Sequence, residues 1–488
     1  MLFNSLPFAL FFPVVTLLYF LLPDRARVPL LLAASCWFYM AFVPKYILIL
    51  AVVIAVDYTA GILIADAPPE RRRLVLVASL VTNVGMLAFF KYFDFLDANL
   101  AALSQALGGG YASHALRIVL PIGLSFHTFQ SMSYTIEVYR GRFPAERSLL
   151  HFATYVMFYP QLVAGPIERP QNLLHQFHAT HDFSWPRVVD GLQLMATGLF
   201  KKIVIADRLA LLVNAVYANP AAHAGPQLLV ATCFFAIQIY CDFSGYSDIA
   251  RGAARVMGYE LMVNFDRPYL ATSIADFWRR WHISLSTWFR DYVYFPLGGN
   301  RRGVAVACRN LTIVFLISGL WHGANWTFVV WGAIHAACMV LYVTTASPRA
   351  RFAEAIGAAG GATGQAVLRA LGWLSTMLVV LLAWVFFRAA TVSDAWLILR
   401  RIATDVVPRP SLDLHPGLDA VQFAIALALV AALFAADAIG RRTRIWNALA
   451  AQPRLRRWGA YYAFAVVFVL LLLWSPERNP QPFIYFQF

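Results

Sequence analysis

Long apolar runs separated by short charged loops organise this chain from end to end. A helix of about 20 apolar residues crosses a bilayer, and shorter runs approach that length. The candidate spans cover residues 6–22, 28–43, 46–65, 74–90, 118–138, 150–165, 190–215, 227–250, 304–321, 325–343, 367–387, 418–437 and 459–474. The pattern predicts an all-α polytopic membrane protein with roughly 11–13 spanning helices.

The loops between the first runs alternate in basic content, which orients the chain. The arginine-rich loops follow the first, third and fifth runs and contain Arg25, Arg27, Arg71, Arg72, Arg73, Arg140, Arg142 and Arg147. The alternate loops contain only Lys45, then Lys91 and Arg117. Because basic loops stay in the cytoplasm, we expect the N-terminus on the outer side of the membrane.

Composition excludes the soluble class. The chain is 60% hydrophobic and 13% charged, whereas an average soluble domain is about 25% charged. A net charge of +14 would suit a nucleic-acid partner, but here the arginines lie in short loops, so we expect the lipid bilayer and no nucleic acid. The first run lacks a basic leader and a small-residue cleavage site, which favours a retained helix over a signal peptide.

Two stretches interrupt the pattern. Residues 166–226 mix prolines, histidines and charges with apolar residues, which favours re-entrant or interfacial helices surrounded by protein or water. The Gly/Ala-rich stretch 356–364 is typical of a loop. No repeat divides the chain, so we expect one integral-membrane domain over residues 1–488.

A polar group at membrane depth marks the segment 318–326. His322 lies there between two apolar runs, flanked by Gly319 and Gly323, which let a helix or a substrate approach closely. A titratable side chain in hydrocarbon is expensive to keep, so a functional site is the default hypothesis. His322 can act as a base for a hydroxyl, with Asn325 as a hydrogen-bond donor to an oxyanion. A histidine that only packs against a neighbouring helix is the alternative.

Residues 264–303 form the long charged connection of the second half. Their basic content places them on the cytoplasmic side, and His282 lies among them. Arginines mixed with aromatic residues suit the membrane interface, which we favour, and they also suit a phosphate-bearing ligand. The candidate ligand-binding residues are Trp278, Trp281, Arg279, Arg280 and Arg290.

The remaining polar clusters point less clearly to chemistry. Asp242 and Tyr246 belong to a polar island at the end of an apolar run, and a network between helices and a substrate-lining role are equally open. We expect no metal site, because His175, His178 and His181, spaced three apart, would drift around a helix and no Cys-x-x-Cys occurs. The two histidines within apolar runs, His127 and His335, are more typical of packing.

Three blocks of the sequence resemble a known family. They are Phe158–Ile167 (FYPQLVAGPI), Asp276–Gly299 (DFWRRWHISLSTWFRDYVYFPLGG) and Gly319–Ala324 (GLWHGA). Together they are similar to the bacterial branch of the membrane-bound O-acyltransferases, within it most of all to the alginate O-acetyltransferase subgroup. The C-terminal Pro482–Phe488 is similar to the ending of that subgroup.

The resemblance implies a function that spacing alone does not show. It implies helices around a central passage and acyl transfer to a hydroxyl, with His322 essential and His282 a second functional histidine. It places the protein in a bacterial inner membrane, where the N-terminus that the basic loops put on the outer side would be periplasmic. It also implies acetyl-CoA as donor, no bound cofactor, a periplasmic SGNH-type acetylase as partner and an exported polysaccharide as acceptor.

We therefore expect an O-acetyltransferase, with the residues of the matched blocks at its site. The residues that we expect to contact substrate are Arg279, Arg280, Arg290, Trp278, Trp281, Trp321, Asn325, Asp242 and Tyr246. Alternatives stay open: a non-catalytic acetyl conduit, a transporter for an anionic solute, or acylation of cellulose, peptidoglycan or teichoic acid.

Overall fold

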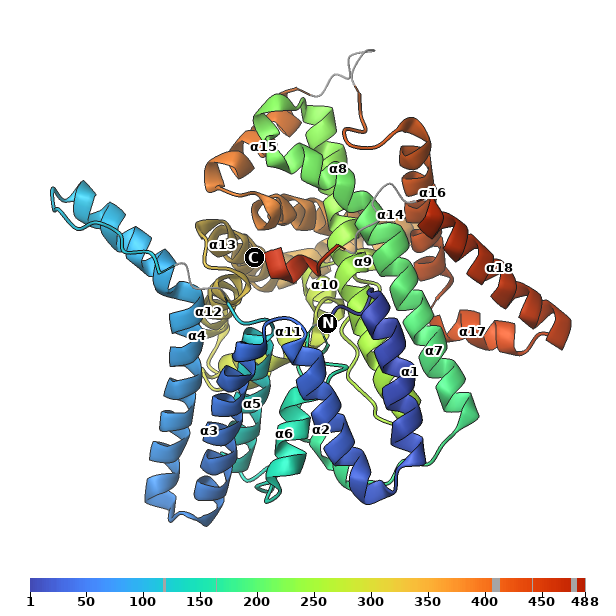
Figure 1. Cartoon of the computed structure of the whole chain (residues 1–488). Coiled ribbons are helices and arrows are strands. Elements are labelled where there is room, and N and C mark those ends of the chain that lie inside the picture. The colour runs from blue at the N-terminus through green and yellow to red at the C-terminus, as the bar shows by residue number, and fades with distance from the viewer. Residues whose placement is uncertain (117–119, 164, 406–412, 441, 475–480, 488) are drawn as a thin grey trace. The chain divides into compact units, whose positions relative to one another are not determined.

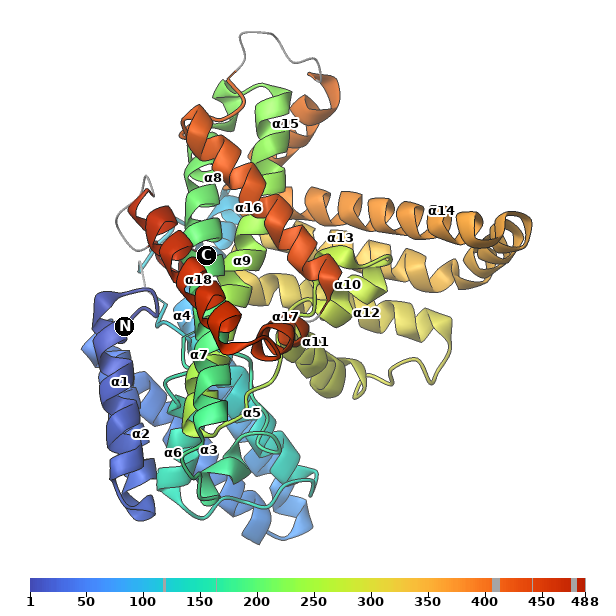
Figure 2. The ribbon, with the colours of Figure 1, turned by 90° about the vertical axis from the view of Figure 1, so that its right-hand side faces the viewer.

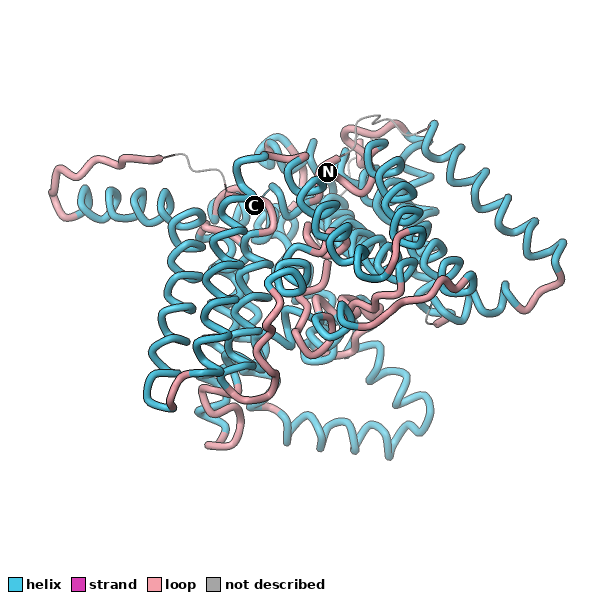
Figure 3. Tube along the Cα trace, turned by 60° about the horizontal axis from the view of Figure 1, so that its bottom comes forward, coloured by secondary structure: helices cyan, strands magenta, loops and turns pink. Residues whose placement is uncertain are grey.

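The computed structural model describes residues 1–116, 120–163, 165–405, 413–440, 442–474 and 481–487. Across these residues the chain consists of helices and loops without a strand, which confirms the all-α class (Figure 3). The chain divides into two compact units. The first comprises Met1–Thr197, Tyr246–Met262 and Tyr485–Phe488, and the second Gly198–Gly245 and Val263–Ile484. The single domain over residues 1–488 stays a prediction.

The first unit contains the N-terminal helices. They are α1 (Leu6–Leu21), α2 (Asp24–Met40), α3 (Ile47–Asp66), α4 (Pro69–Ala106), α5 (Leu124–Tyr139), α6 (Leu149–Met157) and most of α7 (Trp185–Leu199), with the 3₁₀ segments η1 (Pro44–Tyr46) and η2 (Leu174–His178). Helices α3, α4 and α5 pack side by side (Figure 1). Buried Asp57 of α3 accepts hydrogen bonds from Ser79 Oγ at 2.6 Å and Asn83 Nδ2 at 2.9 Å, both on α4. A polar network thus joins two apolar helices.

The second unit contains the remaining helices. They are the π-helix η3 (Phe200–Ala206), α8 (Asp207–Ala218), η4 (Pro220–Ala222), the first part of α9 (Gly225–Met257), η5 (Pro268–Leu270), α10 (Ile274–Arg280), α11 (Ile283–Phe289), the π-helix η6 (Arg290–Tyr294), α12 (Val304–His322), α13 (Trp326–Thr344), α14 (Ala346–Arg388), α15 (Val392–Thr404), α16 (Ala420–Ile439), α17 (Arg442–Ala450) and α18 (Arg454–Leu473). The short η7 (Ile484–Gln487) begins at the last residue of this unit.

Helices α12, α13 and α14 form the part of the second unit that carries His322 (Figure 2). Glycines bring α12 and α13 close together. A Cβ atom on Gly319 would lie 2.3 Å from Phe328 O, and one on Gly332 would lie 2.4 Å from Phe315 O. The close approach expected at Gly319 is therefore confirmed, because a larger side chain there would force the helices apart.

Eight of the described helices are long and apolar enough to cross a membrane. They are Pro44–Asp66, Pro69–Ala106, Gly225–Met257, Val304–His322, Trp326–Thr344, Gly360–Arg388, Ala420–Ile439 and Arg454–Leu473. Each corresponds to one predicted span, so the protein is a multi-pass membrane protein. The predicted run 6–22 forms the shorter apolar helix α1.

The other predicted spans differ from the structure in length. In the run 150–165 the helix α6 ends at Met157, and in the run 118–138 the helix α5 begins at Leu124. Positions 118, 119 and 164 of these runs lie outside the described residues. The run 190–215 contains α7, the π-helix η3 and α8 in succession. The stretch 356–364, expected to be a loop, lies within α14, whose helical geometry breaks at Gly361 with φ 52°. Alanine is the strongest helix former, which explains why this stretch stays helical on either side of the kink.

Candidate functional site

His322 is the last residue of α12, where the chain leaves one apolar helix and approaches the next. Gly323 follows in an extended conformation, with φ −162° and ψ 150°. Asn325 then caps α13: its side-chain oxygen accepts from Thr327 N at 3.0 Å, and its Nδ2 donates to Ala390 O at 3.0 Å. Asn325 thus has a capping role, and its role as an oxyanion donor stays a prediction.

Aromatic rings surround the His322 side chain, which is buried. The ring centroids of Trp321 and Trp331 each lie 5.0 Å from that of His322, and that of Phe387 lies 5.2 Å away. The ring of His282 lies 6.4 Å from that of His322. The structure therefore brings both predicted histidines and Trp321 into one aromatic site.

His282 lies in a strained turn between α10 and α11. Its φ of 43° and ψ of 55° fall in the left-handed region, which side chains other than glycine rarely adopt. Asn264 holds the turn, because its carbonyl accepts from Ile283 N at 2.9 Å and its side-chain oxygen accepts from Ser284 Oγ at 2.6 Å. The ring of Phe243 meets that of His282 edge-on at 4.6 Å. Strain of this kind persists only where the surroundings enforce it, so the imidazole is held in one place.

Burial also determines the charge of His282. Desolvation lowers the pKa of His282 to about 3, so the imidazole is neutral at physiological pH. A neutral imidazole offers one donor and one acceptor nitrogen. His282 is thus suited to orient a neighbour by hydrogen bonding, not to attract an anion by charge.

Trp278, within α10, and Trp281, directly after it, have different surroundings. Trp281 is almost fully buried, stacks on Phe277 at 5.6 Å and lies 5.0 Å from Trp384. The sequence favoured the membrane interface for this segment, but Trp281 packs in the interior because aromatic residues from several helices converge on it. Trp278 lies nearer the edge, with its ring 5.1 Å from that of Phe315 on α12. Substrate binding by Trp281 stays a prediction.

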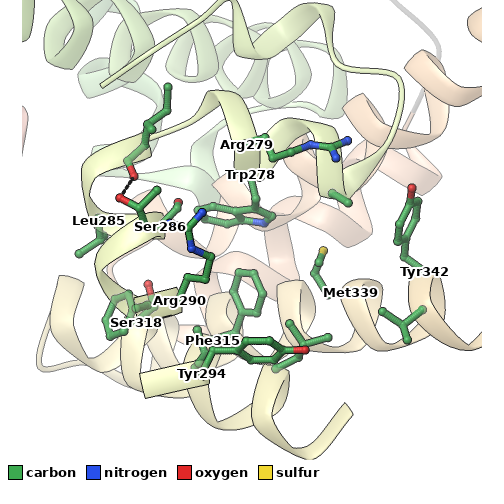
Figure 4. Close-up of a pocket in the computed structure, with 17 residues that line it drawn as sticks. Trp278, Arg279, Leu285, Ser286, Arg290, Tyr294, Phe315, Ser318, Met339 and Tyr342 are labelled. Atoms are coloured by element: carbon green, nitrogen blue, oxygen red, sulfur yellow. Dashed lines mark hydrogen bonds between the residues drawn. The ribbon is translucent and has the colours of Figure 1, made fainter. Parts of the chain in front are cut away.

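A cavity of about 630 Å³ lies between the α10–η6 segment and helices α12 and α13 (Figure 4). Its wall on α12 includes Leu311, Val314, Phe315 and Ser318. Their spacing of three and four residues places them on one helix face, and the next position on that face is His322. One turn, a rise of about 6 Å, separates Ser318 from His322. The volume falls within the range of about 300–1,000 Å³ that is typical of small-molecule sites.

Two of the three predicted arginines line this cavity. The side chains of Arg279 and Arg290 are 72% and 54% exposed and carry positive charge to its solvent side. Arg290 also pairs with Asp291 at 2.8 Å. Arg280 is absent from the lining and pairs with Asp276 at 2.9 Å. The geometry therefore favours Arg279 and Arg290 over Arg280 as contacts for an anionic ligand.

Asp242 belongs to a buried ion cluster. Lys202 Nζ, from the π-helix η3, lies 2.5 Å from Asp242 Oδ1 and 2.8 Å from Asp207 Oδ1. The backbone N–H of Ile484 donates to Asp242 Oδ2 at 2.7 Å. Of the two open interpretations, these contacts favour a network that joins segments of the unit, and a substrate-lining role for Asp242 stays a prediction.

Tyr246 and His335, also considered in the sequence analysis, contact other side chains of the protein. Tyr246 lies in the first unit, where its hydroxyl donates to Asn4 Oδ1 at 3.3 Å. Buried His335 of α13 has its ring 4.8 Å from that of Trp331 and 4.9 Å from that of Trp278. This environment fits the expectation that His335 packs, and substrate contact by Tyr246 stays a prediction.

The sequence analysis missed three residues that shape these sites. Lys202 carries a charge inside the apolar run 190–215, and this charge could have indicated the buried ion pair with Asp242. Trp331 and Phe387 carried no such signal, because each is one more aromatic residue in an apolar run. Only the packing of α13 and α14 against α12 brings these two rings to His322.

Comparison with known proteins identifies relatives over most of the chain. Residues 142–355 match the model of the membrane-bound O-acyltransferase family, and this range includes His282 and His322. The chain is 40% identical over 393 residues to "Probable alginate O-acetylase AlgI" of Pseudomonas aeruginosa, which covers 79% of this chain and 72% of the relative.

The names of more distant relatives refer to other polymers. The chain is 34% identical over 424 residues to the peptidoglycan O-acetyltransferase of Helicobacter pylori, covering 80% of this chain and 77% of that protein. It is 27% identical over 243 residues to the teichoic acid D-alanyltransferase of Bacillus subtilis, covering 45% of this chain and 58% of that protein.

Proposed function

The chain belongs to the membrane-bound O-acyltransferase family, and on this premise we propose that it transfers acetyl groups from acetyl-CoA towards hydroxyl groups of an exported polysaccharide. It is a multi-pass membrane O-acyltransferase; the donor, the direction and the acceptor are our proposal. The observation that carries the proposal is the position of His322, one helical turn beyond a cavity of about 630 Å³ and inside an aromatic site.

We propose that the donor enters the cavity from the arginine-bearing side. The phosphates of CoA bind the guanidinium groups of Arg279 and Arg290, which suit phosphate because they donate several hydrogen bonds in a plane. The flexible arm of CoA, which carries the thioester, then lies along the apolar wall of α12 past Ser318. This placement directs the acetyl group towards His322. Acetyl-CoA is a substrate in this scheme, and no resident cofactor takes part.

We propose that His322 acts as the general base. The hydroxyl oxygen of the acceptor bonds to the thioester carbonyl carbon while His322 takes the hydroxyl proton. The carbon–sulfur bond then breaks, and the proton passes from His322 to the departing thiolate. Neutral His282 orients the reacting groups in this scheme, and the fixed alignment of donor and acceptor contributes much of the rate.

We propose that the final acceptor is an alginate-like polysaccharide, because the relatives with about 40% identity are named alginate O-acetylases. The chain would lie in a bacterial inner membrane with its N-terminus in the periplasm and Arg279 and Arg290 facing the cytoplasm. A secreted SGNH-type acetylase would supply the first hydroxyl that receives the acetyl group and would then pass this group on to the polysaccharide. The whole chain, residues 1–488, acts as one functional domain in this proposal.

The test compares two buried histidines on adjacent helices. His322→Ala should abolish acetylation of the secreted polymer, while the abundance of the variant protein in membranes stays normal. His335→Gln, a change to a packing histidine on α13, should retain most acetylation. Ester content of the polymer and protein level are measured in the same cells. Normal acetylation by His322→Ala, or equal loss in both variants at normal abundance, would contradict the proposal.

A further inference from the structure

A second cluster of chemically active side chains lies in the first unit and shares no residue with the proposed acyltransferase site. It consists of Glu146 in the loop before α6, His151 in the first turn of α6 and His178 at the end of η2. The sequence analysis grouped His178 with His175 and His181. The structure separates that group, because His175 is exposed and His181 Nε2 contacts Gln176 O at 2.9 Å.

The three side chains converge on a small volume. One ligand atom from each of Glu146, His151 and His178 lies within 4.8 Å of the other two. Glu146 Oε2 lies 2.6 Å from His178 Nε2. The rings of His151 and His178 are nearly parallel, with centroids 4.1 Å apart and planes inclined by 17°. Parallel imidazoles can direct one nitrogen each towards a common point after a small tilt.

Neighbouring groups fix the orientation of these side chains. The backbone N–H of Glu146 donates to Tyr134 Oη at 2.9 Å, and the N–H of Ser148 donates to Glu146 Oε1 at 2.8 Å. Oε2 is thus the oxygen directed at His178. Ser148 Oγ lies 2.7 Å from His151 Nδ1. The His151 ring also forms a hydrogen bond with the backbone of Phe177. When Nδ1 is the donating nitrogen of the neutral ring, Nε2 carries the lone pair, which is the arrangement that metal-binding histidines have with their outer partners.

The basic side chain next to Glu146 along the chain is directed elsewhere. Arg147, between Glu146 and Ser148, makes a two-point contact with Asp66, at 2.8 Å and 2.6 Å. Its charge is therefore balanced within that pair. The Glu146 carboxylate remains the charged partner of the two imidazoles.

We propose that Glu146, His151 and His178 bind one divalent transition-metal ion, with Zn²⁺ as the best match. Two imidazoles and one carboxylate form a ligand set that zinc sites use, with water in the fourth position. Ligand atoms about 2.0 Å from a tetrahedral zinc lie roughly 3.3 Å apart. The separations here, between 2.6 Å and 4.8 Å, bracket that value, so side-chain rotation alone can form the site.

The ion would join three segments that are separate along the chain. It would clamp the loop before α6 and the end of η2 to the first turn of α6. The predicted orientation puts these segments near the cytoplasmic face, where metal from the cell interior can reach them. The proposal does not depend on the acyltransferase assignment, because none of the three ligands belongs to the proposed site.

The experiment uses the full-length protein, purified in detergent with its affinity tag removed and stripped with a chelator. Zn²⁺ is titrated by calorimetry, and bound metal is counted by mass spectrometry after gel filtration. We expect one Zn²⁺ per chain, with binding weakened at least about 10-fold in His151→Ala, His178→Ala and Glu146→Gln. His175→Ala, which removes an exposed histidine from the same segment, should bind Zn²⁺ as the wild type does.

Co²⁺ gives a second readout that does not depend on affinity. Four-coordinate Co²⁺ absorbs strongly in the visible range, and this absorption should appear in the wild type and in His175→Ala but not in His178→Ala. His178 is exposed, so its removal should leave the gel-filtration profile unchanged. Absence of stoichiometric Zn²⁺ from the wild type, or equal loss of metal from His175→Ala and His178→Ala, would overturn the proposal.

Discussion

His322 and Lys202 are both buried polar side chains on apolar helical segments of the same unit, yet their surroundings differ. Lys202 lies between two carboxylates, at 2.5 Å from Asp242 and 2.8 Å from Asp207. His322 lies among aromatic rings, one turn beyond a cavity. An ion that only stabilises the fold must be neutralised in place. A group that reacts with a substrate needs space beside it and a charge that can change.

The Lys202 cluster and the His322 site also differ in the role that their contacts suggest. The Lys202 cluster fixes the C-terminal segment, since Lys202 Nζ donates to Pro482 O at 3.3 Å and Asp242 accepts from Ile484 N. The His322 site is assembled from aromatic side chains of α12, α13 and α14, one helical turn beyond the cavity. We therefore expect changes at Lys202 to act on stability and changes at His322 to act on chemistry.

The largest effect on stability should come from Lys202→Ala. Removing one member of a buried ion cluster leaves carboxylates without their counter-charge and costs about 3–5 kcal/mol. Thermal unfolding in detergent and abundance in membranes measure the loss. Lys201→Ala is the matched control, because it removes the neighbouring, half-buried lysine, which donates to Ser244 Oγ. Equal stability of Lys202→Ala and wild type would show that the cluster does not support the fold.

A smaller effect, on donor affinity, should follow from changes at the cavity. Arg279→Ala and Arg290→Ala should each weaken the apparent affinity for acetyl-CoA by about 10-fold or more, since a charge-assisted hydrogen bond contributes about 1.5–3 kcal/mol. The rate at saturating donor should change little. Arg280→Ala removes an adjacent charge outside the lining and serves as control. Weaker affinity in Arg280→Ala than in the other two variants would move the donor site.

A further effect, confined to acidic pH, concerns His282. Its folded pKa of about 3 lies below the unfolded value of about 6.5, so below pH 6.5 the unfolded chain binds a proton that the folded chain does not. Stability from this residue is therefore present above pH 6.5 and is lost as pH falls towards 3. At pH 5 the loss is roughly 2 kcal/mol.

His282→Gln should remove this pH dependence. Between pH 7 and pH 5 the wild type should lose roughly 2 kcal/mol more of its free energy of unfolding than the variant does. His175→Gln, at an exposed position, should behave as the wild type does. The same decline in His282→Gln and wild type would mean that His282 is not buried in its neutral form.

The sequence predicted the membrane class and the main spans because apolar runs of bilayer length leave few other structures. It also placed His322 correctly at the end of a span, since a polar residue interrupts the run there. It could not predict which rings surround His322, because Phe387 itself lies more than 60 residues away along the chain. It likewise could not predict that Glu146 and His151, rather than His175 and His181, lie beside His178, because turns of irregular loops set that contact.

The central claim is that His322 performs chemistry and does not merely line a path. Purified wild type and His322→Gln are incubated with labelled acetyl-CoA, and free CoA, labelled protein and acetyl delivery to a model acceptor are measured. Glutamine keeps a polar side chain of similar size but cannot take up a proton at neutral pH. We predict that the wild type releases CoA as it acetylates the model acceptor and that His322→Gln does not, with delivery at least about 100-fold lower. Near-normal delivery by His322→Gln would contradict the account and leave a non-catalytic acetyl conduit in its place.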